Sequence, residues 1–256
     1  MAPALIVLAA VVAAAVCGML YSLLLAFASI NLKADQTIGG TALNMLATAI
    51  AMILAKHFNG STSAKISYTN KPFLFSIGGL ELSIFIPLGI VLLVVSYIVM
   101  YKTRFGLRLR ACGENPQAAD SLGINVYKMR YAGTTISGAL AGMGGFVYAL
   151  TTANCASNGD VAGFGFLALA VMIFGNWKPL NVAGGALLFG LFKCIAASYS
   201  TLDINGDGIY WLNTIGLNGH FYRLLPYLIT LIVLAFTSKS SRAPKAEGIP
   251  YDKGTR

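Results

Sequence analysis

The chain has 256 residues, of which 57% are hydrophobic and only 11% are charged. Because a soluble domain carries ~25% charged residues, this composition, with a mean hydropathy of +0.72, argues against a soluble protein and predicts an all-α polytopic membrane protein. The net charge of +9 does not indicate a nucleic-acid-binding protein, because the lysines and arginines cluster in polar segments beside apolar stretches.

The first two predicted spans are residues 4–25 and 37–55, each close to the length that crosses a bilayer. No basic stretch precedes the first span, and its apolar run is too long for a signal peptide. In the second span, Thr41, Asn44 and Thr48 follow one another at helical spacing. Polar side chains in a span turn away from lipid, so this stripe either packs against a neighbouring helix or lines a substrate path.

The polar loop at residues 56–80 is expected to form a small hairpin or an irregular cover, and residues 84–101 form the third predicted span. The fourth span, residues 131–152, contains Gly138 and Gly142 in a G-x-x-x-G pattern. Small residues at this spacing let two helix backbones approach closely, which predicts tight packing against another span.

A polar segment, residues 102–130, separates the third and fourth spans and is predicted to contain a short helix. Asn115 is a good N-cap and Pro116 loses nothing at the first helical position, while Gly123 is placed to end the helix in the left-handed conformation. A helix of about two turns is marginal by itself in water. It therefore either docks into a cleft on another protein or rests on the membrane domain of its own chain. Its small apolar face is formed by Ala118, Ala119 and Leu122.

The last part of the chain carries the remaining predicted spans. Residues 164–174 form a brief apolar segment that we count as a crossing, and residues 180–200 and 221–236 form two further spans. Lys193 lies inside an apolar stretch and either snorkels to the membrane surface or faces the interior.

Two polar stretches near the C-terminus complete the sequence. Asp203, Asn205 and Asp207 open a segment like a calcium loop, but Thr214 stands where such a loop needs a glutamate, which favours a tight Gly-rich turn. Residues 239–256 form a basic tail that is expected to be disordered on the cytoplasmic side. The sequence thus predicts one transmembrane domain, residues 1–238, with about seven crossings and the N-terminus outside.

The polar segment also carries a resemblance. The run T-R-F-G-L-R-L-R-A-C-G-E-N-P-Q-A-A-D-S-L-G-I-N-V, residues 103–126, resembles the signature cytoplasmic loop of bacterial ABC-importer permeases of the ribose, branched-chain amino acid and nucleoside type. The resemblance continues in S-G-A-L-A-G-M-G-G, residues 137–145, and A-L-A-V-M-I-F-G, residues 168–175. It implies that the short helix is a coupling helix that seats in a groove of an ATPase subunit. The coupling residues that it implies are Gly113, Glu114, Asn115, Pro116, Ala118, Ala119, Leu122 and Gly123.

The resemblance further implies a multi-pass protein of the bacterial cytoplasmic (inner) membrane, surrounded by lipid. The implied partners are an ATP-binding cassette ATPase, a second permease subunit that is identical or different, and a substrate-binding lipoprotein. The run M-I-F-G-N-W-K-P, residues 172–179, looks like the nucleoside branch, with simple-sugar and branched-chain amino acid permeases as alternatives. Family members are usually longer at the N-terminus, so this chain resembles one that lacks its first span or spans.

Several catalytic and binding motifs are absent from the sequence, which reduces the number of functions to consider. It contains no G-x-x-x-x-G-K-[ST] loop for ATP, no H-E-x-x-H zinc motif and no aspartate or glutamate within a span core. We therefore expect no catalytic residue, no metal ligand and no cofactor on this chain, with ATP hydrolysed by a separate subunit. The alternative from another class is a passive channel or facilitator, whose activity would persist after ATP depletion.

Overall fold

The computed structural model divides the chain into two compact units, residues 1–162 together with 244–256, and residues 163–243. The candidate calcium loop lies outside the described residues, as does most of the predicted span at 221–236. The structure describes residues 3–60, 66–67, 73–77, 80–151, 156–157, 159–198, 221, 224, 227–228, 231–232 and 242–253.

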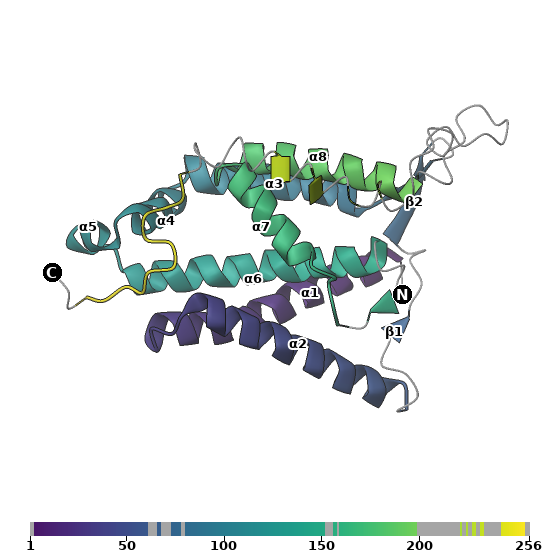
Figure 1. Ribbon diagram of the computed structural model, residues 1–256, viewed down its shortest axis with the longest axis horizontal. Coiled ribbons are helices and arrows are strands. Elements are labelled where there is room, and N and C mark those ends of the chain that lie inside the picture. The colour runs from purple at the N-terminus through teal and green to yellow at the C-terminus, as the bar shows by residue number, and fades with distance from the viewer. Residues whose placement is uncertain are drawn as a thin grey trace. The chain divides into compact units, whose positions relative to one another are not determined.

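Helices make up most of the first unit (Figure 1). In chain order they are α1 (Pro3–Ala26), which continues into the π-helical turn η1 (Phe27–Asn31), α2 (Gln36–Phe58), α3 (Phe85–Lys102), α4 (Arg104–Glu114), α5 (Pro116–Ser121) and α6 (Val126–Thr151). The second unit contains α7 (Phe164–Phe174) and α8 (Pro179–Ser198).

Four helices in the described part of the chain are long and apolar enough to cross a membrane, which confirms the all-α polytopic class. They are Leu5–Asn31, Gln36–Phe58, Phe85–Lys102 and Pro179–Ser198. Helix α6 has 26 residues and at 1.5 Å per residue is about 39 Å long, although it is rich in glycine and threonine. Helix α7 has only 11 residues. The total of about seven crossings stays a prediction.

Two short antiparallel strand pairs accompany the helices. Strand β2 (Leu74–Ile77) pairs with β3 (Leu80–Ser83), which confirms a hairpin between the second and third spans. Strand β1 (Ile66–Ser67) pairs with β4 (Ala156–Ser157). The second pair joins the segment after α2 to the segment after α6, so α2 and α6 end on the same side of the unit.

Helices α1 and α6 lie side by side along much of their length (Figure 1). A methyl group added to Gly18 would lie 2.8 Å from the Cα atom of Gly142, and one added to Gly142 would overlap the Ala14 carbonyl oxygen. At Gly138 the added group would overlap the Ser22 side chain. The G-x-x-x-G prediction is thus confirmed, because the glycines allow the backbones of the two helices to touch.

An apolar cluster lies where α1 and α3 begin and α6 ends. Val7, Phe73, Phe85 and Leu150 are buried there together, and the rings of Phe73 and Phe146 meet edge to face with centroids 5.6 Å apart. At the opposite end of the unit, the Tyr131 hydroxyl donates a 2.6 Å hydrogen bond to Asn31 Oδ1. Helices α1 and α3 therefore run in one direction and α6 in the other, as consecutive alternating crossings require.

Candidate docking site around helix α5

Helix α5 is a six-residue helix with both ends closed by local hydrogen bonds. The Ala118 N–H donates to Asn115 Oδ1 at 3.0 Å, and Pro116 stands at the first turn, as the sequence predicts. At the C-terminus, Gly123 adopts φ +81° and the Ile124 N–H donates to the Ala119 carbonyl at 3.1 Å. This six-to-one bond with a left-handed glycine is the Schellman motif, which confirms the predicted cap.

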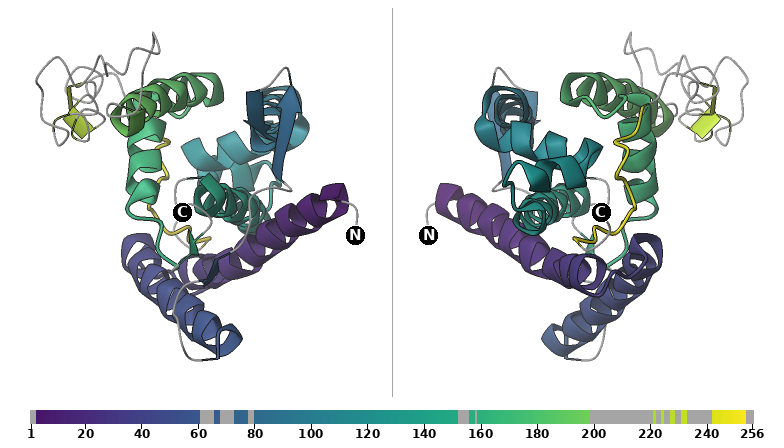
Figure 2. Two further views of the ribbon diagram at one scale, coloured as in Figure 1. Left: turned by 90° about the vertical axis from the view of Figure 1, so that its right-hand side faces the viewer. Right: turned by 90° about the vertical axis from the view of Figure 1, so that its left-hand side faces the viewer.

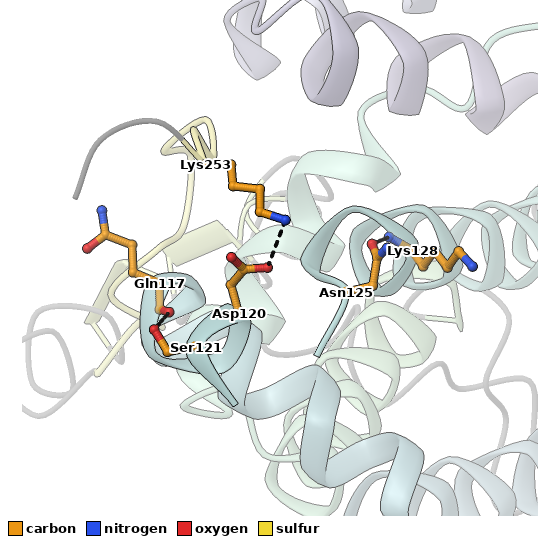
Figure 3. Close-up of polar contacts among 6 residues, drawn as sticks. All are labelled: Gln117, Asp120, Ser121, Asn125, Lys128 and Lys253. Atoms are coloured by element: carbon orange, nitrogen blue, oxygen red, sulfur yellow. Dashed lines mark hydrogen bonds and ion pairs between the residues drawn. The ribbon is translucent and has the colours of Figure 1, made fainter. Parts of the chain in front are cut away.

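The helices on either side of α5 have their own caps. Thr103 caps α4 by accepting a hydrogen bond from the Gly106 N–H at 3.2 Å, and Asn125 caps α6 by accepting one from the Lys128 N–H at 3.0 Å (Figure 3). Only a few residues separate the ends of α4, α5 and α6. Helix α5 is therefore joined closely in sequence to α6 and, through α4, to α3.

Ala119 does not share an exposed face with Ala118 and Leu122, so that expectation is wrong. Ala119 is 2% exposed and Leu122 is 81% exposed, while Ala118 is also exposed. Ala119 lies in a buried cluster with Cys112, Val126 and Tyr251. Helical periodicity could not distinguish the two sides, because the covering residue, Tyr251, comes from the far end of the chain.

The C-terminal segment packs against the α4–α5–α6 region, which differs from the disordered tail expected from the sequence (Figure 1). The Ala246 N–H donates to the Gly113 carbonyl at 2.9 Å, and Arg130 Nη1 donates to the Ile249 carbonyl at 3.0 Å. Tyr251 is only 6% exposed. The composition suggested disorder because it is polar and rich in Pro and Gly, but a single large aromatic ring gives this segment a surface to bury.

Two ion pairs connect the C-terminal segment to the rest of the unit. Lys33 Nζ lies 2.6 Å from Asp252, with both side chains nearly half exposed, and Lys253 Nζ lies 4.0 Å from Asp120 of α5 (Figure 3). The hydrogen bond that Lys33 donates to the Asp252 carboxylate raises the pKa of Lys33. Solvent screens exposed pairs of this kind and their contribution to stability is small, so they align the segment while the buried ring supplies most of its packing.

An open cavity of about 570 Å³ lies between α5 and the C-terminal segment. Gln117, Ala118 and Ser121 line one side, and Asp252 and Lys253 line the other. Burial raises the pKa of the Cys112 thiol beneath α5, so this cysteine is a packed thiol at neutral pH rather than a nucleophile. The exposed surface of α5 is polar at its start and apolar at Leu122, which suits docking of another protein better than catalysis.

The three residues proposed for a substrate path lie on α2. The Thr41 hydroxyl donates to the Ile38 carbonyl at 2.8 Å, and the Thr48 hydroxyl donates to the Asn44 carbonyl at 3.2 Å and approaches the Gly159 carbonyl at 3.5 Å. Helix α2 diverges from α1 after η1 (Figure 2). The contact at Gly159 shows that Thr48 packs against the segment between β4 and α7, and a path role stays a prediction.

In the second unit, Lys193 lies on α8 with its ammonium group 3.1 Å from the centroid of the Phe164 ring of α7. A cation over an aromatic face is attracted by the ring quadrupole. The charge therefore finds a partner within its own unit. Among the described residues, no group of three or more His, Cys, Asp or Glu side chains could hold a metal ion.

The contacts of Lys33, Arg130 and Tyr251 with distant segments were not predicted from the sequence. A signal for Tyr251 was present, because it is the one aromatic residue in the mostly polar tail at residues 239–256. The residues around Tyr251 could not be found from sequence spacing, because Ala119 and Tyr127 lie more than a hundred positions away in the chain.

A polytopic helical domain with a short capped helix between two of its long helices defines a multi-pass membrane protein. Residues 1–234 match the family model described as "Branched-chain amino acid transport system / permease component". The chain belongs to this permease family. It is the permease component of a transport system and a multi-pass protein of the cytoplasmic membrane, in a family of transporters.

Several relatives are similar over most of the chain. It is 41% identical over 249 residues to the nucleoside ABC transporter permease protein NupC of Lactococcus lactis, covering 93% of this chain and 76% of the relative. It is 39% identical over 268 residues to the guanosine ABC transporter permease protein NupQ of Bacillus subtilis, covering 100% of this chain and 79% of the relative. A putative glucose ABC transporter permease protein, TsgC13 of Haloferax volcanii, is 30% identical over 243 residues, covering 86% of this chain and 72% of the relative. No solved structure matches the chain.

Proposed function

We propose that this chain is the membrane-spanning subunit of an ABC importer that takes up a neutral nucleoside, with a simple sugar as the second choice. The observation that carries the proposal is the similarity over nearly the whole chain to two permeases named for nucleoside and guanosine transport. The weaker similarity to a putative glucose permease supports the second choice.

The chain works with separate partners in this proposal. An ATP-binding cassette ATPase docks on the exposed side of α5, a second permease subunit completes the pathway, and a substrate-binding lipoprotein delivers the solute. ATP is bound and hydrolysed on the ATPase, so this chain holds neither cofactor nor metal of its own. Closure of the ATPase dimer displaces α5, and the short connections to α4 and α6 pass that displacement to the spans.

Competition during uptake tests the substrate assignment. With labelled guanosine as the transported solute, an excess of another unlabelled nucleoside should block most of the uptake, whereas excess ribose, glucose or leucine should leave it unchanged. The reason is that a site built to hydrogen-bond a nucleobase rejects compounds that leave its polar groups unpaired. The measurement uses the importer reconstituted in vesicles with its ATPase and binding protein.

Uptake of the other labelled solutes gives the contradicting results. If labelled ribose or glucose is taken up and labelled guanosine is not, the transporter belongs to the sugar group. Uptake of labelled leucine alone would place it with the amino acid transporters instead.

A further inference from the structure

The C-terminal segment contacts two parts of the first unit that are far apart in the sequence: the loop after η1, through Lys33, and helix α5, through Asp120. We define residues 244–253 as the C-terminal clasp. We propose that the clasp holds α5 in the orientation required for docking, with Tyr251 as the positioning residue. This inference rests on the proposed function, because it assumes that α5 is where the ATPase binds.

The first step concerns how Tyr251 is held. Its ring packs in the buried cluster with Ala119 and meets the Tyr127 ring edge to face, with centroids 5.3 Å apart. The Arg130 guanidinium lies 6.0 Å from the Tyr251 ring centroid and donates to the backbone at Ile249. Contacts from α6 therefore fix the ring within the same buried cluster that contains Ala119 of α5.

The second step concerns what fixes the rotation of α5 about its own axis. Its caps satisfy backbone groups at both ends, but they do not set the rotation of the helix about its axis. Ala119 is the only α5 residue that the structure buries, so its pocket determines which side of α5 faces outward. Tyr251 forms part of that pocket. Removal of the ring would open the pocket and leave a short helix that is marginal in isolation.

The third step is that the clasp is attached on both sides of α5. The bond from Ala246 to Gly113 lies just before the helix, and Lys253 reaches Asp120 near its end (Figure 3). Asp252 pairs with Lys33 in the loop between η1 and α2. The clasp thus links α5 to the first two spans as well as to α6.

The test compares Tyr251→Ala with Tyr251→Phe in the full-length protein. Ile249→Ala is the matched control, because the Ile249 side chain belongs to the same clasp but is 58% exposed. Two quantities are measured: amide hydrogen exchange in residues 116–121 of the purified permease, and the affinity of the permease for its ATPase subunit. Leu122→Arg is included as an independent probe of docking on α5.

Tyr251→Ala should speed exchange in α5 while α1 and α6 stay protected, and should weaken ATPase binding about tenfold. The affinity falls because it scales with the fraction of molecules in which α5 is correctly placed. Tyr251→Phe and Ile249→Ala should behave like the original protein, because the first keeps the ring and the second changes an exposed side chain.

Unchanged exchange in α5 of Tyr251→Ala overturns the inference, whatever happens to binding. Unchanged ATPase affinity in Tyr251→Ala also overturns it when Leu122→Arg does weaken binding, and the docking proposal then stands alone. If neither variant weakens binding, α5 is not the ATPase site and the proposed coupling mechanism fails together with this inference.

Discussion

Replacing Leu122 by arginine should abolish transport while leaving the permease folded. Leu122 is 81% exposed, so the isolated subunit tolerates a charged side chain at this position. In the complex, the same charge would lie in the interface with the ATPase. An unpaired buried charge costs several kcal/mol, and about 1.4 kcal/mol corresponds to a factor of ten in affinity. We expect the affinity for the ATPase to weaken by at least about 100-fold. Co-purification and surface plasmon resonance would measure this change.

Two further substitutions separate docking from folding. Leu107→Arg is the matched control, because Leu107 of α4 is 62% exposed and lies outside the proposed docking surface; it should bind the ATPase normally. Ala119→Arg should instead destabilise the permease itself, because Ala119 is buried against Tyr251. Normal binding and uptake by Leu122→Arg would remove the exposed side of α5 from the interface.

Replacing Gly142 by leucine should prevent α1 and α6 from packing together. Any side chain at this position would overlap the α1 backbone at Ala14, and the Cα atom of Gly18 would be only 3.0 Å away. Overpacking an ordinary core position costs about 1–3 kcal/mol. Here the obstacle is backbone rather than a flexible side chain, so the helices must separate and the loss should be larger. The expected result is a strongly reduced yield of monodisperse protein and a lower melting temperature.

Gly144→Leu supplies the matched control on the same helix. A side chain added at Gly144 would meet nothing within 4 Å, so this variant should purify and melt like the original protein. Equal stability of Gly142→Leu and Gly144→Leu would contradict the close packing of α1 and α6.

Local features of the chain were predicted well from the sequence, because their causes lie within a few residues. Asn115 and Gly123 close α5 through bonds to neighbouring backbone groups. The G-x-x-x-G pattern at Gly138 and Gly142 indicated close packing correctly, although the sequence did not name α1 as the partner. Apolar length alone predicted the spans that the structure describes.

Features that depend on contacts between distant segments were not predicted. The position of Ala119 at i+1 from Ala118 gave no indication of which residue faces outward, since the answer depends on Tyr251. The tail was expected to be disordered because its average composition is polar, but the Tyr251 ring and several polar contacts attach residues 244–253 to the unit. For Thr48, periodicity identified a polar stripe without deciding between packing and transport.

The most direct test of the account is ATP-dependent uptake of labelled guanosine into vesicles that contain this permease with its ATPase, second permease subunit and binding protein. The account predicts that guanosine accumulates inside above its outside concentration when ATP is supplied to the ATPase. A non-hydrolysable ATP analogue should stop accumulation, and so should Leu122→Arg. Uptake that proceeds equally without ATP and ends at equal concentrations on both sides would show a passive facilitator and contradict the account.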